Sequence, residues 1–167
     1  MKRIVVIALA VTALAVVGSA TATAAVTQSA NGHGSLDSGR RQFSFSASEN
    51  ADGSVTGQAT LVNRSFTGQN TNAPYQLHIE ITCMNVIGNI AFFGGTTKRT
   101  NYPNLVDAVF FSVQDIAEPG KGVDMISRAF FWDDDPNTTG DPQACENNVV
   151  GDFPMEPIES GNIQVRS

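Results

Sequence analysis

The chain of 167 residues has few of the side chains on which metal centres and many enzymes depend, with two cysteines, two histidines and one tryptophan. Neither His33 nor His78 stands at metal-ligand spacing from a cysteine, so the ligand set of a tetrahedral zinc site is missing. The patterns Gly-x-Ser-x-Gly and His-Glu-x-x-His are absent as well. We therefore assign no catalytic residue, no cofactor and no metal ligand from motifs.

Basic residues are also scarce, since ten Lys and Arg face sixteen Asp and Glu, for a net charge of −6. Without Lys2 and Arg3, which belong to the leader described below, the net charge becomes −8. Such a surface disfavours nucleic acid and anionic lipid as partners. The range Asp107–Ser167 holds twelve acidic and three basic residues, so this half of the chain is expected to meet a cation or water.

Only one long apolar run is present, at the N-terminus. Lys2 and Arg3 precede the apolar stretch Ile4–Val17, which leads into the small residues Gly18–Ala25. This order is that of a secretory signal peptide. An uncleaved membrane helix is the alternative, but the run falls short of the about 20 apolar residues that span a bilayer. No later run is long enough to anchor the mature chain.

We therefore assign residues 1–25 to a signal peptide and residues 26–167 to a single domain, secreted to the cell envelope or beyond. Export brings Cys83 and Cys145 into a compartment where disulfides persist, and we expect them to be paired. In the chain-entropy model, closing a loop of this length stabilises the fold by about 4 kcal/mol. The alternative is two free thiols, one in the core and one in a loop.

Amphipathic helical spacing is missing from the mature chain, and a period of two replaces it. The clearest case is Tyr75–Thr97, where a strand is followed by the turn pair Gly88-Asn89 and a second apolar run. One face of its first strand carries Leu77, Ile79, Ile81 and Cys83, and the other carries His78, Glu80, Thr82 and Met84. This stretch predicts a β-hairpin at the centre of a sheet.

The remaining runs predict two more hairpins and a closing strand: Arg41–Ala47 with Val55–Val62, Leu105–Val113 with Asp124–Trp132, and Ser160–Val165. Val26–Ala30 is expected to be a frayed lead-in, and Asp133–Pro157 a long loop tethered at Cys145. The fold expected is all-β, an antiparallel sandwich or small barrel of about seven or eight strands, preceded by the signal-peptide helix.

Short stretches throughout the mature chain resemble a family of short secreted bacterial β-domains known as post-COAP domains. The matching stretches are Gly32–Leu36, Phe43–Phe45, Cys83–Asn89, Asp115–Gly120, Asp124 and Ser160–Gln164. The resemblance implies a secreted, bacterial, all-β protein, and it implies no activity and no functional residues. The stretch Asp133–Pro157 is longer than the simple hairpin of that family.

The acidic stretch Trp132–Asp141 is where a partner is expected to bind, because an aromatic ring beside carboxylates suits sugar or cation recognition. Asp133, Asp135 and Asn137 are spaced so that an irregular loop aims alternate oxygens at a calcium ion. The alternative is an ordinary acidic loop with Trp132 in the core, since the glycine and distal glutamate of an EF-hand are missing.

The resulting hypothesis is a secreted, non-catalytic β-domain with a binding or structural role and an unknown extracellular or envelope partner. The alternative is a secreted hydrolase that acts on a polysaccharide through paired carboxylates, because any two of the sixteen acidic residues are able to converge in the fold.

Overall fold

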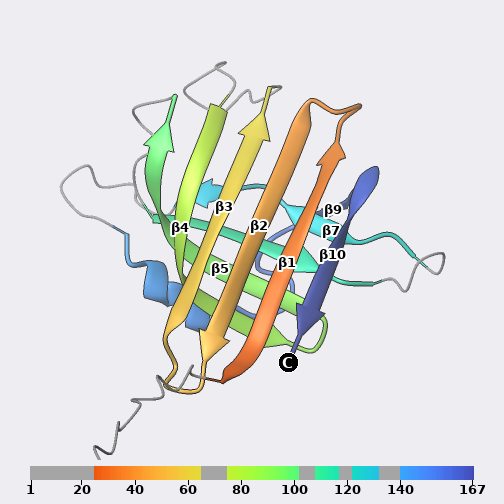
Figure 1. The fold of residues 1–167 in the computed structure, drawn as a ribbon. Coiled ribbons are helices and arrows are strands. Elements are labelled where there is room, and N and C mark those ends of the chain that lie inside the picture. The colour runs from red at the N-terminus through yellow and green to blue at the C-terminus, as the bar shows by residue number, and fades with distance from the viewer. Residues whose placement is uncertain (1–24, 65–74, 102–107, 117–121, 132–139) are drawn as a thin grey trace, which may run out of the picture.

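The computed structural model describes residues 25–64, 75–101, 108–116, 122–131 and 140–167 (Figure 1). Within these residues the fold is all-β, as expected. The elements are β1 (Val26–Leu36), β2 (Arg41–Asn50), β3 (Val55–Asn63), β4 (Tyr75–Ile87), β5 (Ile90–Thr100), β6 (Ala108–Gln114), β7 (Met125–Ser127), β8 (Phe130–Phe131), the 3₁₀ helix η1 (Pro142–Asn147), β9 (Met155–Pro157) and β10 (Ser160–Arg166). The predicted signal-peptide helix lies outside the described residues.

All ten strands belong to one antiparallel sheet in the order β10-β1-β2-β3-β4-β5-β6-β7-β9, with β8 also paired to β6. The sheet curls into a half-barrel, so that β5 and β7 pass behind β1, β2 and β3 (Figure 1). Register shifts between β4 and β5, at His78/Ile79 and at Ile81/Cys83, mark bulges. Bulges bend a strand and increase its twist, which accounts for the curl.

The core fills the concave side of the half-barrel. Phe45 of β2 lies 5.3 Å from Phe93 of β5 and 6.0 Å from Phe111 of β6, measured between ring centroids, and Phe93 and Phe111 stack at 4.7 Å. Burial of rings of this size supplies most of the favourable free energy of such a core. The strand alternation read from Phe43, Phe45 and their neighbours is confirmed.

Two glycines in β1 make room for this core. The Phe45 ring lies over Gly32 and the Phe43 ring over Gly34, so that a Cβ on either glycine would stand 2.8 Å from a ring atom. Rings packed over strand glycines recover the burial that a missing side chain loses. The stretch Gly32-His33-Gly34 thus has a packing reason inside the sheet.

The three predicted hairpins are present, with two differences. The run Asp124–Trp132 is divided into β7 and β8, both paired with β6, because the Ser127 hydroxyl replaces a carbonyl and accepts from the Ser112 amide at 2.8 Å. The described residues contain ten strands, above the seven or eight expected, since β7, β8 and β9 are pieces of two or three residues that carry no period-two signal.

Two local predictions were wrong. Val26–Ala30 is not a frayed lead-in but the first part of β1, which pairs with both β2 and β10 and therefore needs no apolar pattern to be held. The described part of Asp133–Pro157 is not a featureless loop, since it contains η1 and β9. The closing strand predicted at Ser160–Val165 is confirmed as β10.

Candidate functional site

Cys83 and Cys145 form the predicted disulfide, with their Cα atoms 6.0 Å apart. Cys83 does not share a face with Leu77, Ile79 and Ile81, as the alternation had indicated. The bulge between Ile81 and Cys83 shifts the alternation by one residue, so Met84 enters the concave core and Cys83 turns to the outer face. This reversal is what allows the disulfide to hold η1 against the outside of the sheet.

Side chains of η1 and of the sheet fasten the helix beside the disulfide. The side-chain amide of Gln143 donates to the Thr82 backbone carbonyl at 3.1 Å. The side-chain amide of Asn85 donates to the backbone carbonyls of Glu146 and Asn148 at 3.2 and 3.3 Å. Gly94 of β5 permits the close approach, because a Cβ there would overlap the backbone of Pro142. The helix is therefore held against β4 and β5 at several points.

The start of η1 carries a local signal that the sequence reading did not use. Asp141 is the N-cap of η1, and its carboxylate accepts a hydrogen bond from the backbone N–H of Gln143 at 2.9 Å. Pro142 lies in the first turn. Asp before Pro is a favoured beginning of a helix. Of the acidic cluster, Asp133, Asp134 and Asp135 lie outside the described residues, whereas the Asp141 carboxylate has this capping role.

Where η1 meets β6, it leaves a pocket of about 240 Å³ lined by Phe110, Ala144, Asn147, Asn148 and Phe153. Phe110 and Phe153 are buried, and a third ring, Phe130, lies tilted against Phe153 with the ring centroids 4.8 Å apart. The lining is mostly apolar with two amides, a composition typical of small-molecule sites. None of the five was singled out as a site residue from the sequence, although Phe110 and Phe111 are neighbours that pack into two different apolar clusters.

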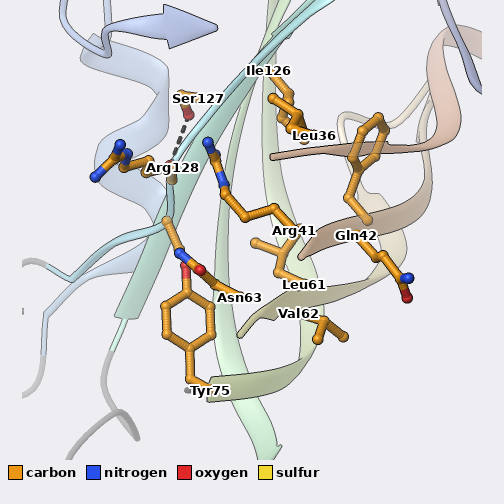
Figure 2. A pocket seen from close by; sticks show the side chains of 12 residues that line it. Leu36, Arg41, Gln42, Leu61, Val62, Asn63, Tyr75, Ile126, Ser127 and Arg128 are labelled. Carbon is orange, nitrogen blue, oxygen red and sulfur yellow. Dashed lines mark hydrogen bonds between the residues drawn. The ribbon is translucent and has the colours of Figure 1, made fainter. Parts of the chain in front are cut away.

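A second cavity lies at the opposite side of the fold, between the start of β2 and β7 (Figure 2). Its volume is about 20 Å³, which is room for about one water molecule. Figure 2 shows the Arg41 side chain extending between Leu61 and the segment that carries Ser127 and Arg128. The cavity is too small for a substrate. Two of the residues that line it, Arg41 and Arg128, carry a positive charge.

Glu156 of β9 joins two arginines beside this cavity. Arg41 Nη1 donates to one of its carboxylate oxygens at 2.6 Å and Arg128 Nε donates to the other at 2.9 Å. Burial by itself would raise the pKa of Glu156, but the hydrogen bonds and charges of Arg128 and Arg41 outweigh it and lower that pKa. Because Arg41 is only 6% exposed, Glu156 is the neutralising partner of a buried cation.

Tyr75 packs against the same cluster, with its hydroxyl directed toward the Asn63 amide in Figure 2. Burial raises the pKa of Tyr75, although hydrogen bonding to Asn63 and the positive charges of Arg41 and Arg128 oppose the rise. Tyr75 is therefore a neutral phenol at ordinary pH. The ion pair between Arg41 and Glu156 joins β2 to β9.

Several other described carboxylates have structural partners. Asp124, only 5% exposed, accepts from the Ile116 and Ile163 amides at 3.1 and 2.8 Å, and Asp115 accepts from the Val165 amide at 3.1 Å. Asp152 accepts from the Val149 amide at 2.8 Å. Within the described ranges no three or more His, Cys, Asp or Glu residues are grouped so that they hold a metal ion.

Both histidines lie on the outer face of the sheet. His33 of β1 is exposed, and His78 of β4 is half-buried between the Thr60 hydroxyl at 3.2 Å and the Gln76 amide at 3.2 Å. Among the described residues neither histidine forms an ion pair with a carboxylate. No helix in the described ranges is long and apolar enough to cross a membrane.

Comparisons with known proteins add no identification. No protein-family model matches the chain, and neither a curated protein nor a solved structure does.

Proposed function

We propose that the protein is a secreted, non-catalytic β-domain that acts by binding outside the cell or at the cell envelope. We place its binding site in the pocket between η1 and β6. The observation that carries this proposal is the pocket itself, in which two buried phenylalanine rings and two asparagine amides line about 240 Å³. A neutral aromatic ring is the ligand group that fits such a lining, since rings pack favourably against rings.

The construction of the pocket supports this assignment. Its η1 wall is anchored by the Cys83–Cys145 disulfide and by Gln143 and Asn85, so little conformational entropy is lost when a ligand enters. Glu146 on η1 and Asp152 beside Asn148 make the surroundings acidic, which disfavours an anionic ligand. The disulfide also favours an oxidising compartment, in line with the signal peptide read from the sequence and with the resemblance to post-COAP domains.

A catalytic role has less support. Asp115, Asp124 and Glu156, three acidic residues of the sheet region, bind backbone amides or arginines. The described residues that line the pocket include no ionisable side chain. Acid–base chemistry needs such groups within hydrogen-bond reach of the substrate.

Binding of phenol to the mature domain tests the proposal, with benzoate as an anionic ring of similar size. Chemical-shift titration should give saturable binding of phenol with a dissociation constant of about 1 mM, the range expected of so small a ligand, and much weaker binding of benzoate. Ala144→Phe fills the pocket from an exposed position and should abolish binding. Val150→Phe adds the same ring at an exposed position outside the lining and should leave binding unchanged.

Absence of saturable phenol binding, or equal binding by the Ala144→Phe variant, would remove the pocket from consideration. Release of reducing sugar from a polysaccharide by the purified domain would replace the proposal with the hydrolase alternative.

A further inference from the structure

The outer face of β10, β1, β2, β3 and β4 presents a continuous grid of polar side chains. The pairing register aligns them in four rows across the strands: Asn162–His33–Ser44–Thr60–His78, Gln164–Asn31–Ser46–Gln58–Glu80, Ser160–Ser35–Gln42–Val62–Gln76, and Arg166–Ser29–Ser48–Thr56. Residues directly opposite each other on neighbouring strands share a face. The rows therefore form one surface, on the side away from the phenylalanine core.

This surface is almost free of full charge and of large apolar groups. Glu80 and Arg166 are its charged residues, each on an outermost strand of the grid, and Glu80 is paired with Lys98. Val62 is its one large aliphatic residue. Hydroxyls and amides make up nearly all the rest, and each of them is able both to donate and to accept hydrogen bonds. The long charged side chains common on solvated surfaces are rare here.

The centre of this surface is hollow. A shallow depression of about 270 Å³ lies over Ser44 and Ser46 of β2 and Gln58 and Thr60 of β3. Over the depression β2 contributes the short side chains of Ser44 and Ser46, whereas the β1 residues opposite them are His33 and Asn31. Short side chains between longer ones create a trough that follows β2.

The groups in the trough are largely available to a ligand. Thr60 is bonded to His78, and Ser35 to Ser160 at the edge of the face, at 3.2 and 2.9 Å. The side chains of Ser44, Ser46 and Gln58 make no hydrogen bond to another described residue. Serine has few rotamers to lose, so ordering it on a ligand costs less conformational entropy than ordering lysine or glutamate.

From these observations we propose that the trough along β2 binds an extended, uncharged polysaccharide chain. A neutral chain rich in hydroxyl groups matches a row of uncharged donors and acceptors. The mature chain's net charge of −8 opposes an anionic polymer, and the described residues that line the trough offer no carboxylate to a cationic one. This site is separate from the η1 pocket, which is lined by different residues from β6, from η1 and from the chain that follows η1.

The proposal is tested by co-sedimentation of the mature domain with insoluble cellulose, chitin and mannan, and with calcium-gelled alginate as an anionic polymer. We expect depletion by at least one neutral polysaccharide, little dependence on salt from roughly 0.05 to 1 M, and no depletion by alginate. Charged partners would instead show binding that weakens steeply with salt.

Substitutions in the trough locate the binding. Ser44→Gln with Ser46→Gln fills it without adding charge and should weaken retention about tenfold or more. Ser29→Gln makes the same change on β1, outside the depression, and should leave retention unchanged. Melting curves of both variants verify that each is folded.

Retention of the double variant at the level of the unchanged protein would overturn the proposal, and so would retention on alginate alone or on none of the polymers. The Ala144→Phe variant separates the two sites. It should keep polysaccharide retention while losing phenol, and the double serine variant should show the reverse. Failure at either site is thus distinguishable from failure at the other.

Discussion

The Asp124 carboxylate accepts a hydrogen bond from the Ile163 amide at 2.8 Å and so connects the start of β7 to β10, the strand at one end of the sheet. The same carboxylate accepts from Ile116, and Asp115 accepts from Val165 two residues further along β10. Amides on a strand edge are a template for unwanted pairing unless they are covered. The two carboxylates cover this edge where a closed barrel would supply another strand.

Asp124→Asn should therefore destabilise the domain. An amide keeps one acceptor but turns a donor toward one of the two backbone N–H groups, so a loss of about 2 kcal/mol in unfolding free energy is expected. Glu146→Gln changes an exposed carboxylate and serves as the matched control. Urea denaturation of both variants measures the difference, and equal midpoints would show that the edge needs no such cover.

Gly94→Ala should displace η1, because the new Cβ would overlap the Pro142 backbone. Overpacking of this kind costs about 1–3 kcal/mol, and phenol binding in the pocket should fall with it. Gly88→Ala is the comparison: its φ of 64° strains an alanine by about 1–2 kcal/mol, but nothing lies within 4 Å of its Cβ. It should leave the pocket intact. A Gly94→Ala variant with normal phenol binding would contradict the docking geometry.

The disulfide should be present in protein purified without reductant, so thiol titration of the denatured, unreduced material should find no free cysteine. Cys145→Ser should lower the unfolding free energy by about 4 kcal/mol, with the melting temperature falling by roughly 10 °C or more. Two titratable thiols per chain, or an unchanged melting temperature in the variant, would contradict this expectation.

Glu156→Gln should lower stability at neutral pH and remove part of its dependence on pH. The folded pKa of Glu156 is lowered, so its ion pairs stabilise the fold above the unfolded pKa of about 4.3, and this contribution is lost as the pH falls through the folded pKa. The expected cost at pH 7 is about 1–2 kcal/mol, discounted because the Glu156 side chain is 36% exposed.

Melting curves of both proteins from pH 7 down to about 3 provide the measurement. The gap between the protein and its Glu156→Gln variant should narrow below about pH 4. A gap that stays constant across this range would mean that Glu156 contributes by packing rather than by charge.

Much of the fold could be predicted because the alternation of a strand and the residues of a turn depend on neighbouring positions in the sequence. The alternation at Phe43 and Phe45, the turn at Gly88 with its positive φ, and the closing strand at Ser160 each follow from neighbours in the chain. The division of Asp124–Trp132 could not be predicted, because it depends on a hydroxyl of Ser127 that reaches another strand.

The candidate sites were less accessible to such reasoning. The pocket combines Phe110 of β6 with Ala144 and Phe153, which come from a stretch without periodicity. No local sequence pattern indicates that these three residues are close in space. The trough requires the register of β1, β2 and β3, which aligns residues such as His33, Ser44 and Thr60. Taken one at a time, these polar residues are indistinguishable in the sequence from ordinary surface residues.

By itself the sequence determined an all-β domain, the elements of its hairpins and the pairing of Cys83 with Cys145, since each depends on local spacing or on the number of cysteines. Tertiary structure alone decided which face Cys83 occupies, because one extra residue at the bulge between Ile81 and Cys83 reverses every side chain beyond it. That reversal puts η1 on the outside of the sheet, and with it the pocket.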